Sequence, residues 1–128
     1  MIQSFWVPGP LPSLNDLLRA KGNMVGGKGK RWNGYNAMKK TWETTIWAIC
    51  KRDRIQPMQR VRVVFQWHER TMRRDPDNVG AARKLILDAL VCAGVLVNDG
   101  PKEIAGFAET FVYGAPVAGV QVTLEAVS

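Results

Sequence analysis

The sequence predicts one α+β domain spanning residues 1–128, in which a mixed β-sheet packs two main helices largely on one face. Two observations lead to this prediction. Segments with the period of a strand alternate with segments with the period of a helix, in the order β-α-β-α-β-β. The 128 residues have the length of one ordinary domain, and 46% hydrophobic with 23% charged residues is typical of a globular protein.

The first half of the chain is expected to hold one strand, a long loop and one helix. Residues 2–7 are β-branched and aromatic and end at PGPLPS, which predicts a strand. Residues 17–42 contain seven basic residues, five glycines and no acidic residue, so the first part of this segment is predicted to be a mobile, positively charged arm. After Asn36 the apolar side chains recur every three or four residues, which predicts a helix that runs to about Arg52.

The second half is expected to hold a strand, a helix and a hairpin. Residues 61–68 alternate between apolar and polar side chains, the pattern of a strand with one buried face. The apolar positions of residues 79–93 share one side of a helical wheel, and Gly94 is placed to end that helix. Residues 104–112 and 117–125 are strand candidates separated by YGAP, a turn sequence typical of a hairpin.

Charge and composition exclude several classes of function. The net charge of +7 favours a polyanionic partner, with nucleic acid first. No apolar stretch approaches the roughly 20 residues of a membrane-spanning helix, and the N-terminus lacks the features of a secretory signal, so the protein is expected in the cytoplasm. Cys50 and Cys92 stand singly in apolar patterns, which predicts that both are buried and excludes a zinc site. Serine hydrolase and P-loop motifs are absent from the sequence.

Three aspartates are the candidate metal ligands. Pro76 favours an extended backbone at Asp75, which would place the side chains of Asp75 and Asp77 on the same side, close enough to share a hard cation. Asp99 follows the predicted helix in VNDG, and three such carboxylates are a plausible ligand set for Mg²⁺. Because a helix of about 15 residues is some 22 Å long, Asp99 reaches the other two only if its loop folds back. In the alternative interpretation, one aspartate of the pair caps the helix and the other shapes the turn.

The charged residues on the predicted helix have an ordinary interpretation as well. Lys84 and Asp88 stand four residues apart on the side opposite the apolar stripe, where an exposed ion pair is expected. Arg83 is interpreted as a solvated charge.

The segment RRDPDNVGAARKLILDALVCAGVLVNDG, from Arg73 to Gly100, resembles the RusA-type Holliday junction resolvases. That family's signature is a basic run, D-x-D-N, a lysine and an aspartate on a helix, then A-G and a loop ending in aspartate. PLPSLN at residues 10–15 is similar to the family's Pro-Ser-x-Asn element after the first strand. Together the two segments cover about a quarter of the chain.

The resemblance implies a Mg²⁺-dependent endonuclease, with Mn²⁺ as a substitute, that acts as a homodimer on four-way DNA junctions in recombination and repair in a bacterial or phage-infected cell. It implies that the essential carboxylates are those of Asp75, Asp77 and Asp99 and that the catalytic lysine is Lys84. Asn78 and Asp88 belong to the same motif as supporting residues. The basic residues expected to contact the DNA backbone are Arg73, Arg74, Lys28, Lys30, Arg31, Lys39 and Lys40.

Two other functions fit the same residues. One is a non-catalytic, basic DNA-binding module whose aspartates only cap and turn the chain. The other is a flap or replication-fork nuclease that uses the same acidic site and differs only in the geometry of its DNA substrate.

Overall fold

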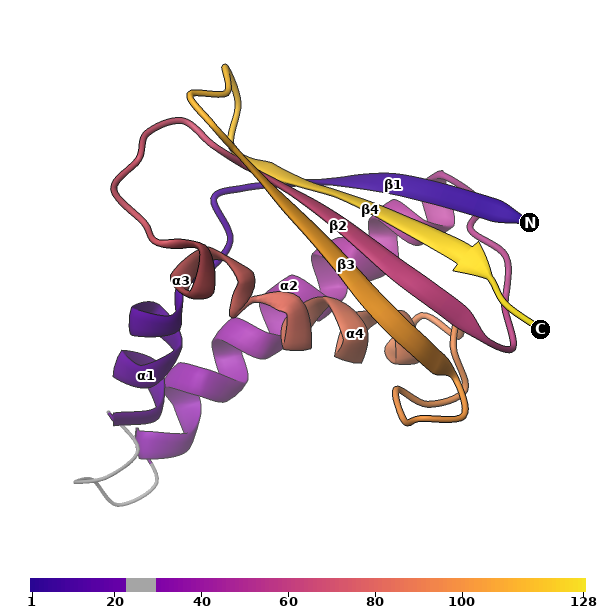
Figure 1. Cartoon of the computed structure of the whole chain (residues 1–128). Coiled ribbons are helices and arrows are strands. Elements are labelled where there is room, and N and C mark those ends of the chain that lie inside the picture. The colour runs from indigo at the N-terminus through magenta and orange to yellow at the C-terminus, as the bar shows by residue number, and fades with distance from the viewer. Residues whose placement is uncertain (23–29) are drawn as a thin grey trace.

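The computed structural model describes residues 1–22 and 30–128, and these form an α+β domain with a four-stranded mixed sheet whose helices lie on one side (Figure 1). The predicted α+β class with a mixed sheet is confirmed, but the predicted order β-α-β-α-β-β is wrong after the first strand, where two helices lie before the second strand. The strands are β1 (Ile2–Pro8), β2 (Val61–Glu69), β3 (Ile104–Tyr113) and β4 (Gly119–Ala126). The helices are α1 (Leu14–Gly22), α2 (Lys30–Arg52), α3 (Pro76–Gly80) and α4 (Arg83–Cys92).

The strand order is β1-β4-β2-β3, so the predicted hairpin between the last two strands is wrong. β4 pairs antiparallel with both β1 and β2, while β3 pairs parallel with β2. Residues 114–118 carry the chain across the end of β2, where Ala115 N–H donates to the carbonyl of Glu69 over 3.0 Å. β2, the strand with the clearest alternation, therefore lies between β3 and β4, the two strands that the turn sequence predicted to be paired.

The segment after β1 is more helical than predicted. α1 begins where Ser13 and Asp16 form a reciprocal cap: the Asp16 carboxylate accepts from Ser13 N–H over 2.9 Å, and the Ser13 hydroxyl accepts from Asp16 N–H over 3.0 Å. The prediction of a loop is thus wrong for residues 17–22, and the predicted arm at residues 23–29 lies outside the described residues. α2 starts at Lys30 rather than after Asn36, and it ends at Arg52 as predicted.

The predicted helix over residues 79–93 is divided into α3 and α4. Residues 81 and 82 form a turn between the two helices, and Ala82 has ψ of −6°, compared with a helical value of about −42°. Val79 of α3 and Ile86 of α4 are both buried, which shows that each helix contributes to the core. Gly94 ends α4 as predicted: its φ is 78°, and the N–H groups of Gly94 and Val95 donate back to the carbonyls of Val91 and Leu90.

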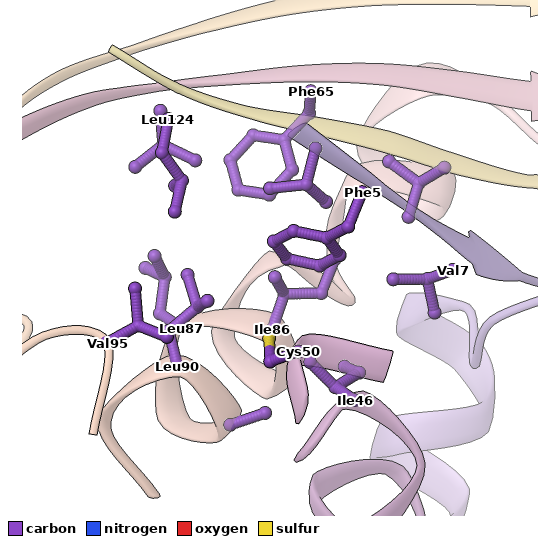
Figure 2. Packing of buried hydrophobic residues seen from close by; sticks show 14 of the residues in the cluster. Phe5, Val7, Ile46, Cys50, Phe65, Ile86, Leu87, Leu90, Val95 and Leu124 are labelled. Atoms are coloured by element: carbon purple, nitrogen blue, oxygen red, sulfur yellow. The ribbon is translucent and has the colours of Figure 1, made fainter. Parts of the chain in front are cut away.

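The core is one hydrophobic layer between the sheet and the helices α2 and α4. Figure 2 shows Phe5, Phe65 and Leu124 of the sheet facing side chains of the helices, among them Ile46 and Leu90. Cys50 belongs to this core as predicted, and its burial raises the pKa of its thiol to about 11.

Cys92 is exposed, so the prediction that both cysteines are buried is wrong for this one. It lies in the last turn of α4, on the side that does not pack against the sheet. None of the helices in the described part of the chain has the length and apolar character that a bilayer crossing requires.

Two glycines on the same face of the sheet provide a test of the packing. A Cβ added to Gly119 would collide with the Trp6 ring and lie 2.6 Å from the carbonyl oxygen of Val7, whereas one added to Gly106 would meet nothing within 4 Å. We expect Gly119→Ala to lower the free energy of unfolding by about 1–3 kcal/mol, and Gly106→Ala to change it by less than about 1 kcal/mol. Urea unfolding followed by circular dichroism measures both, and equal effects would contradict this account of the β1–β4 contact.

Candidate active site

A groove runs along the first turns of α3 and α4 where they face β3. It consists of two neighbouring hollows of about 300 and 390 Å³ that share Gly80, Ala81 and Arg83 as lining residues. Asp77 lines the first hollow and Asp99 lines the second. We call these two hollows together the α4 groove; its other lining residues are Pro76, Lys84, Leu87, Phe107, Glu109 and Phe111.

Asp99 reaches this groove because the loop after α4 folds back along the helix. Its carboxylate accepts a hydrogen bond from the Lys84 ammonium over 2.8 Å, and Lys84 lies in the first turn of α4. The loop therefore folds back along α4, as the predicted role of Asp99 required. Lys84 also contacts Asp88 over 2.9 Å, the predicted i,i+4 ion pair. One ammonium thus joins two carboxylates, one on the helix and one on the returning loop.

This contact shifts the pKa of both partners. The hydrogen bond from Lys84 lowers the pKa of the Asp99 carboxyl, and the hydrogen bonds to Asp99 and then Asp88 raise the pKa of Lys84 above its ordinary value. Each shift favours the charged form. At neutral pH the second hollow therefore contains a paired ammonium and carboxylate.

Asp75 and Asp77 lie at the start of α3 with exposed side chains. Asp75 has ψ of 155°, the extended conformation predicted from Pro76, and its side chain makes no capping hydrogen bond, so it does not act as the alternative cap. Both carboxylates lie near the hydroxyl of Tyr113. The pKa of that hydroxyl is raised first by burial and then by the charges of Glu69, Asp75 and Asp77.

Glu109 is a carboxylate of the groove that the sequence analysis missed. It accepts a hydrogen bond from the indole N–H of Trp67 over 2.8 Å and forms an ion pair with Arg83, which was expected to be a solvated charge. The sequence spacing could have identified it. Glu109 lies two residues from Phe107 and from Phe111, so its side chain shares the face of β3 that is turned toward the helices. An acidic residue at such a position needs a partner.

The two segments that carry the family resemblance meet in the structure. The side-chain oxygen of Asn78 accepts a hydrogen bond from the backbone N–H of Asn15 over 3.2 Å. The guanidinium of Arg74 donates to the carbonyl of Leu11 over 2.8 Å and lies 3.3 Å from a carboxylate oxygen of Glu69. The sequence analysis assigned Asn78 to support and Arg74 to DNA contact. In the structure Asn78 joins α3 to α1, and Arg74 joins the segments that precede these two helices; we call these contacts together the joint.

The other residues expected to bind DNA are dispersed. Lys39 forms ion pairs of 3.6 Å with Glu43 and with Asp88, so it links α2 to α4. Lys40 and Arg73 are exposed. Three more predictions concern residues outside the described part of the chain: Lys28, and the side chains of Lys30 and Arg31.

The three predicted metal ligands do not form one group. Among the described residues, no three His, Cys, Asp or Glu side chains lie close enough together to hold a metal ion. Asp99 already forms an ion pair with Lys84. Asp75 and Asp77 are therefore the two predicted ligands that remain available to a metal ion. Their donor chemistry is that of a Mg²⁺ ligand, because Mg²⁺ commonly takes one or two protein carboxylates and completes its coordination with water and substrate phosphate.

No protein-family model matches the chain, and a search of curated proteins found no match to it. The family resemblance accordingly depends on the two motif segments and on the contacts that join them.

The Lys84–Asp99 contact predicts a measurable titration. In Lys84→Gln we expect the pKa of the Asp99 carboxyl to rise toward the ordinary aspartate value of about 3.9, since the ammonium that lowers it is gone. Carboxyl ¹³C NMR over a pH titration measures this shift. Lys51→Gln, which removes an exposed lysine from α2, serves as the control and should leave Asp99 unchanged.

The same contact predicts how stability depends on pH. Because folding lowers the pKa of Asp99, its contribution to stability is present above the ordinary aspartate pKa and is lost as the pH falls through the lowered value. Wild type should therefore lose more unfolding free energy than Lys84→Gln between about pH 5 and pH 2. Identical acid profiles for the two proteins would show that the ion pair does not form in solution.

Proposed function

We propose that this chain is a divalent-metal-dependent endodeoxyribonuclease that hydrolyses phosphodiester bonds in branched DNA, with a four-way junction as its main substrate. The observation that carries the proposal is the α4 groove: Asp99 returns along α4, so that two aspartates 22 positions apart in the chain, Asp77 and Asp99, line neighbouring hollows with Lys84 beside them. The contact between the two motif segments supports the same proposal.

In this proposal Asp75 and Asp77 would hold Mg²⁺. The ion, when bound, would lower the pKa of a water and neutralise charge on the scissile phosphate. Water adds to phosphorus and the bond to the 3′ oxygen breaks, leaving a 5′-phosphate and a 3′-hydroxyl. Lys84 would stabilise the negative charge that develops on the phosphate oxygens. Asp99 would hold the Lys84 ammonium at the groove in the absence of DNA.

A homodimer completes the proposal. Two opposed strands of a junction must be cut, and one chain offers one α4 groove. A twofold dimer supplies two such sites in a fixed relative orientation.

The second candidate is a DNA-binding module without catalysis. It is favoured by the pairing of Asp99 with Lys84, since a carboxylate that already has an ammonium partner is less available to a metal ion. In that case the net charge of +7 would serve binding alone.

Cleavage of a synthetic junction decides between the two candidates. We expect wild type to nick a labelled four-way junction in Mg²⁺ or Mn²⁺ and not in EDTA, and Asp77→Asn to lose at least about a hundredfold in rate, about 2.7 kcal/mol of transition-state stabilisation. A denaturing gel measures the products, and flap and fork substrates tested in parallel identify the preferred branch. Junctions that are bound but never cut in any divalent metal would leave the binding module as the function.

Asp75 provides a separate test in metal-free buffer. Its exposed carboxylate would repel the phosphates of DNA. We therefore expect Asp75→Asn to bind junction DNA as tightly as wild type or more tightly in EDTA, measured by fluorescence anisotropy at low salt. Clearly weaker binding by a variant with an unchanged circular dichroism spectrum would show that Asp75 has a structural role instead.

A further inference from the structure

Phe107 is an exposed aromatic side chain beside the α4 groove. It lies on β3 opposite the buried Val63, on the face of the sheet that the helices cover, yet 43% of its surface is exposed. The hollow that contains Lys84 and Asp99 lies in front of it and explains the exposure. Among the described residues the other exposed aromatic side chain is Trp47, on α2.

Phe107 packs against aromatic and charged side chains. The centres of its ring and of the buried Phe65 ring lie 6.1 Å apart, and the Phe65 ring in turn stacks on Trp67. The guanidinium of Arg83 lies over the Phe107 ring, 4.8 Å from its centre, and the same guanidinium forms an ion pair with Glu109. Two planar groups, a ring and a guanidinium, are therefore held together at the wall of the groove.

The charges around the ring are already paired. Arg83 is bound to Glu109, and Lys84 is bound to Asp99 and Asp88. A phosphate would gain little from these balanced charges in the absence of a metal ion. A nucleobase, in contrast, is a flat neutral group that stacks on aromatic rings and on guanidinium planes.

We infer that Phe107 and Arg83 form a stacking platform for one unpaired nucleobase of a DNA strand lying in the α4 groove. The inference rests on the proposed function, because it takes DNA as the ligand. It adds that the groove recognises an unpaired nucleobase of that DNA. Base pairs in a continuous duplex are stacked and closed, whereas an unpaired nucleotide at a branch point can expose its base. The platform would thus favour branched DNA over duplex DNA without reading base sequence.

The experiment measures binding in EDTA, where no cleavage can occur. Three probes are compared by fluorescence anisotropy: a four-way junction with one unpaired thymine at the branch point, the fully paired junction, and a linear duplex. Phe107→Leu removes the ring and keeps apolar bulk, and Phe107→Trp keeps a stacking ring. Trp47→Leu is the matched control, because Trp47 is 44% exposed and also lies near a cation, Lys51.

We expect Phe107→Leu to bind the junction with the unpaired thymine about tenfold more weakly than wild type, with no change for the duplex. Phe107→Trp should bind that junction at least as well as wild type, and Trp47→Leu should not differ from wild type. Replacing the unpaired thymine by 5-iododeoxyuridine and irradiating should crosslink the DNA to Phe107, as mass spectrometry of the peptide would show.

Equal affinity of wild type and Phe107→Leu for all three probes would overturn the platform, and so would an equal loss on all three. These outcomes are separate from those of the proposed nuclease. A protein that cuts junctions but shows no effect of Phe107→Leu has the activity without the platform. A protein that never cuts, yet loses binding selectively in Phe107→Leu, has the platform without the activity.

Discussion

Burial of one face of the sheet positions the helix and the strand that form the walls of the α4 groove. Leu87 belongs both to the hydrophobic core and to the groove wall, and Phe65 and Trp67 lie behind Phe107 and Glu109. Burying one such side chain contributes about 1.5–3 kcal/mol, whereas an exposed ion pair contributes about 1 kcal/mol or less. Packing of α4 against the sheet therefore determines where the backbone of the charged residues lies. The ion pairs between Lys84 and its partners then determine only the conformations of these side chains.

The groove contrasts with the surface charge of the whole protein. The chain carries a net charge of +7, and a positive charge attracts polyanions over a distance that depends on salt. Within the groove, Lys84 and Arg83 are each bound to carboxylates, while Asp77, which lines it, and Asp75, two residues earlier in the chain, are exposed. In the proposed function, the overall charge would draw the protein to DNA, and a cation, or an uncharged contact such as stacking, would act at the point of close approach.

The contacts between the two motif segments give some of the motif residues an architectural role. Asn78 and Arg74 bind backbone groups of residues 15 and 11, each 63 positions away in the chain. The hydroxyl of Tyr113 donates to the carbonyl of Arg74 over 2.8 Å and ties β3 to the same joint. Asp75 and Asp77 follow directly, so the joint holds their backbone while leaving their side chains exposed. A short sequence motif can thus combine residues that position the chain with residues that are available for chemistry.

By itself, the sequence determined the elements that depend on local pattern: the alternation of β2, the end of α2 at Arg52, the stop at Gly94 and the extended backbone at Asp75. It also paired Lys84 with Asp88 and grouped Asp99 with Asp75 and Asp77, although it did not predict that the Lys84 ammonium joins Asp88 to Asp99. Only the tertiary structure decided that β2 separates β3 from β4, that α1 forms, and that Glu109, Arg83 and Phe107 enter the groove. Hydrophobic period and turn chemistry act between neighbours in the chain, whereas strand order and side-chain pairing depend on which surfaces become buried against each other once the whole chain is folded.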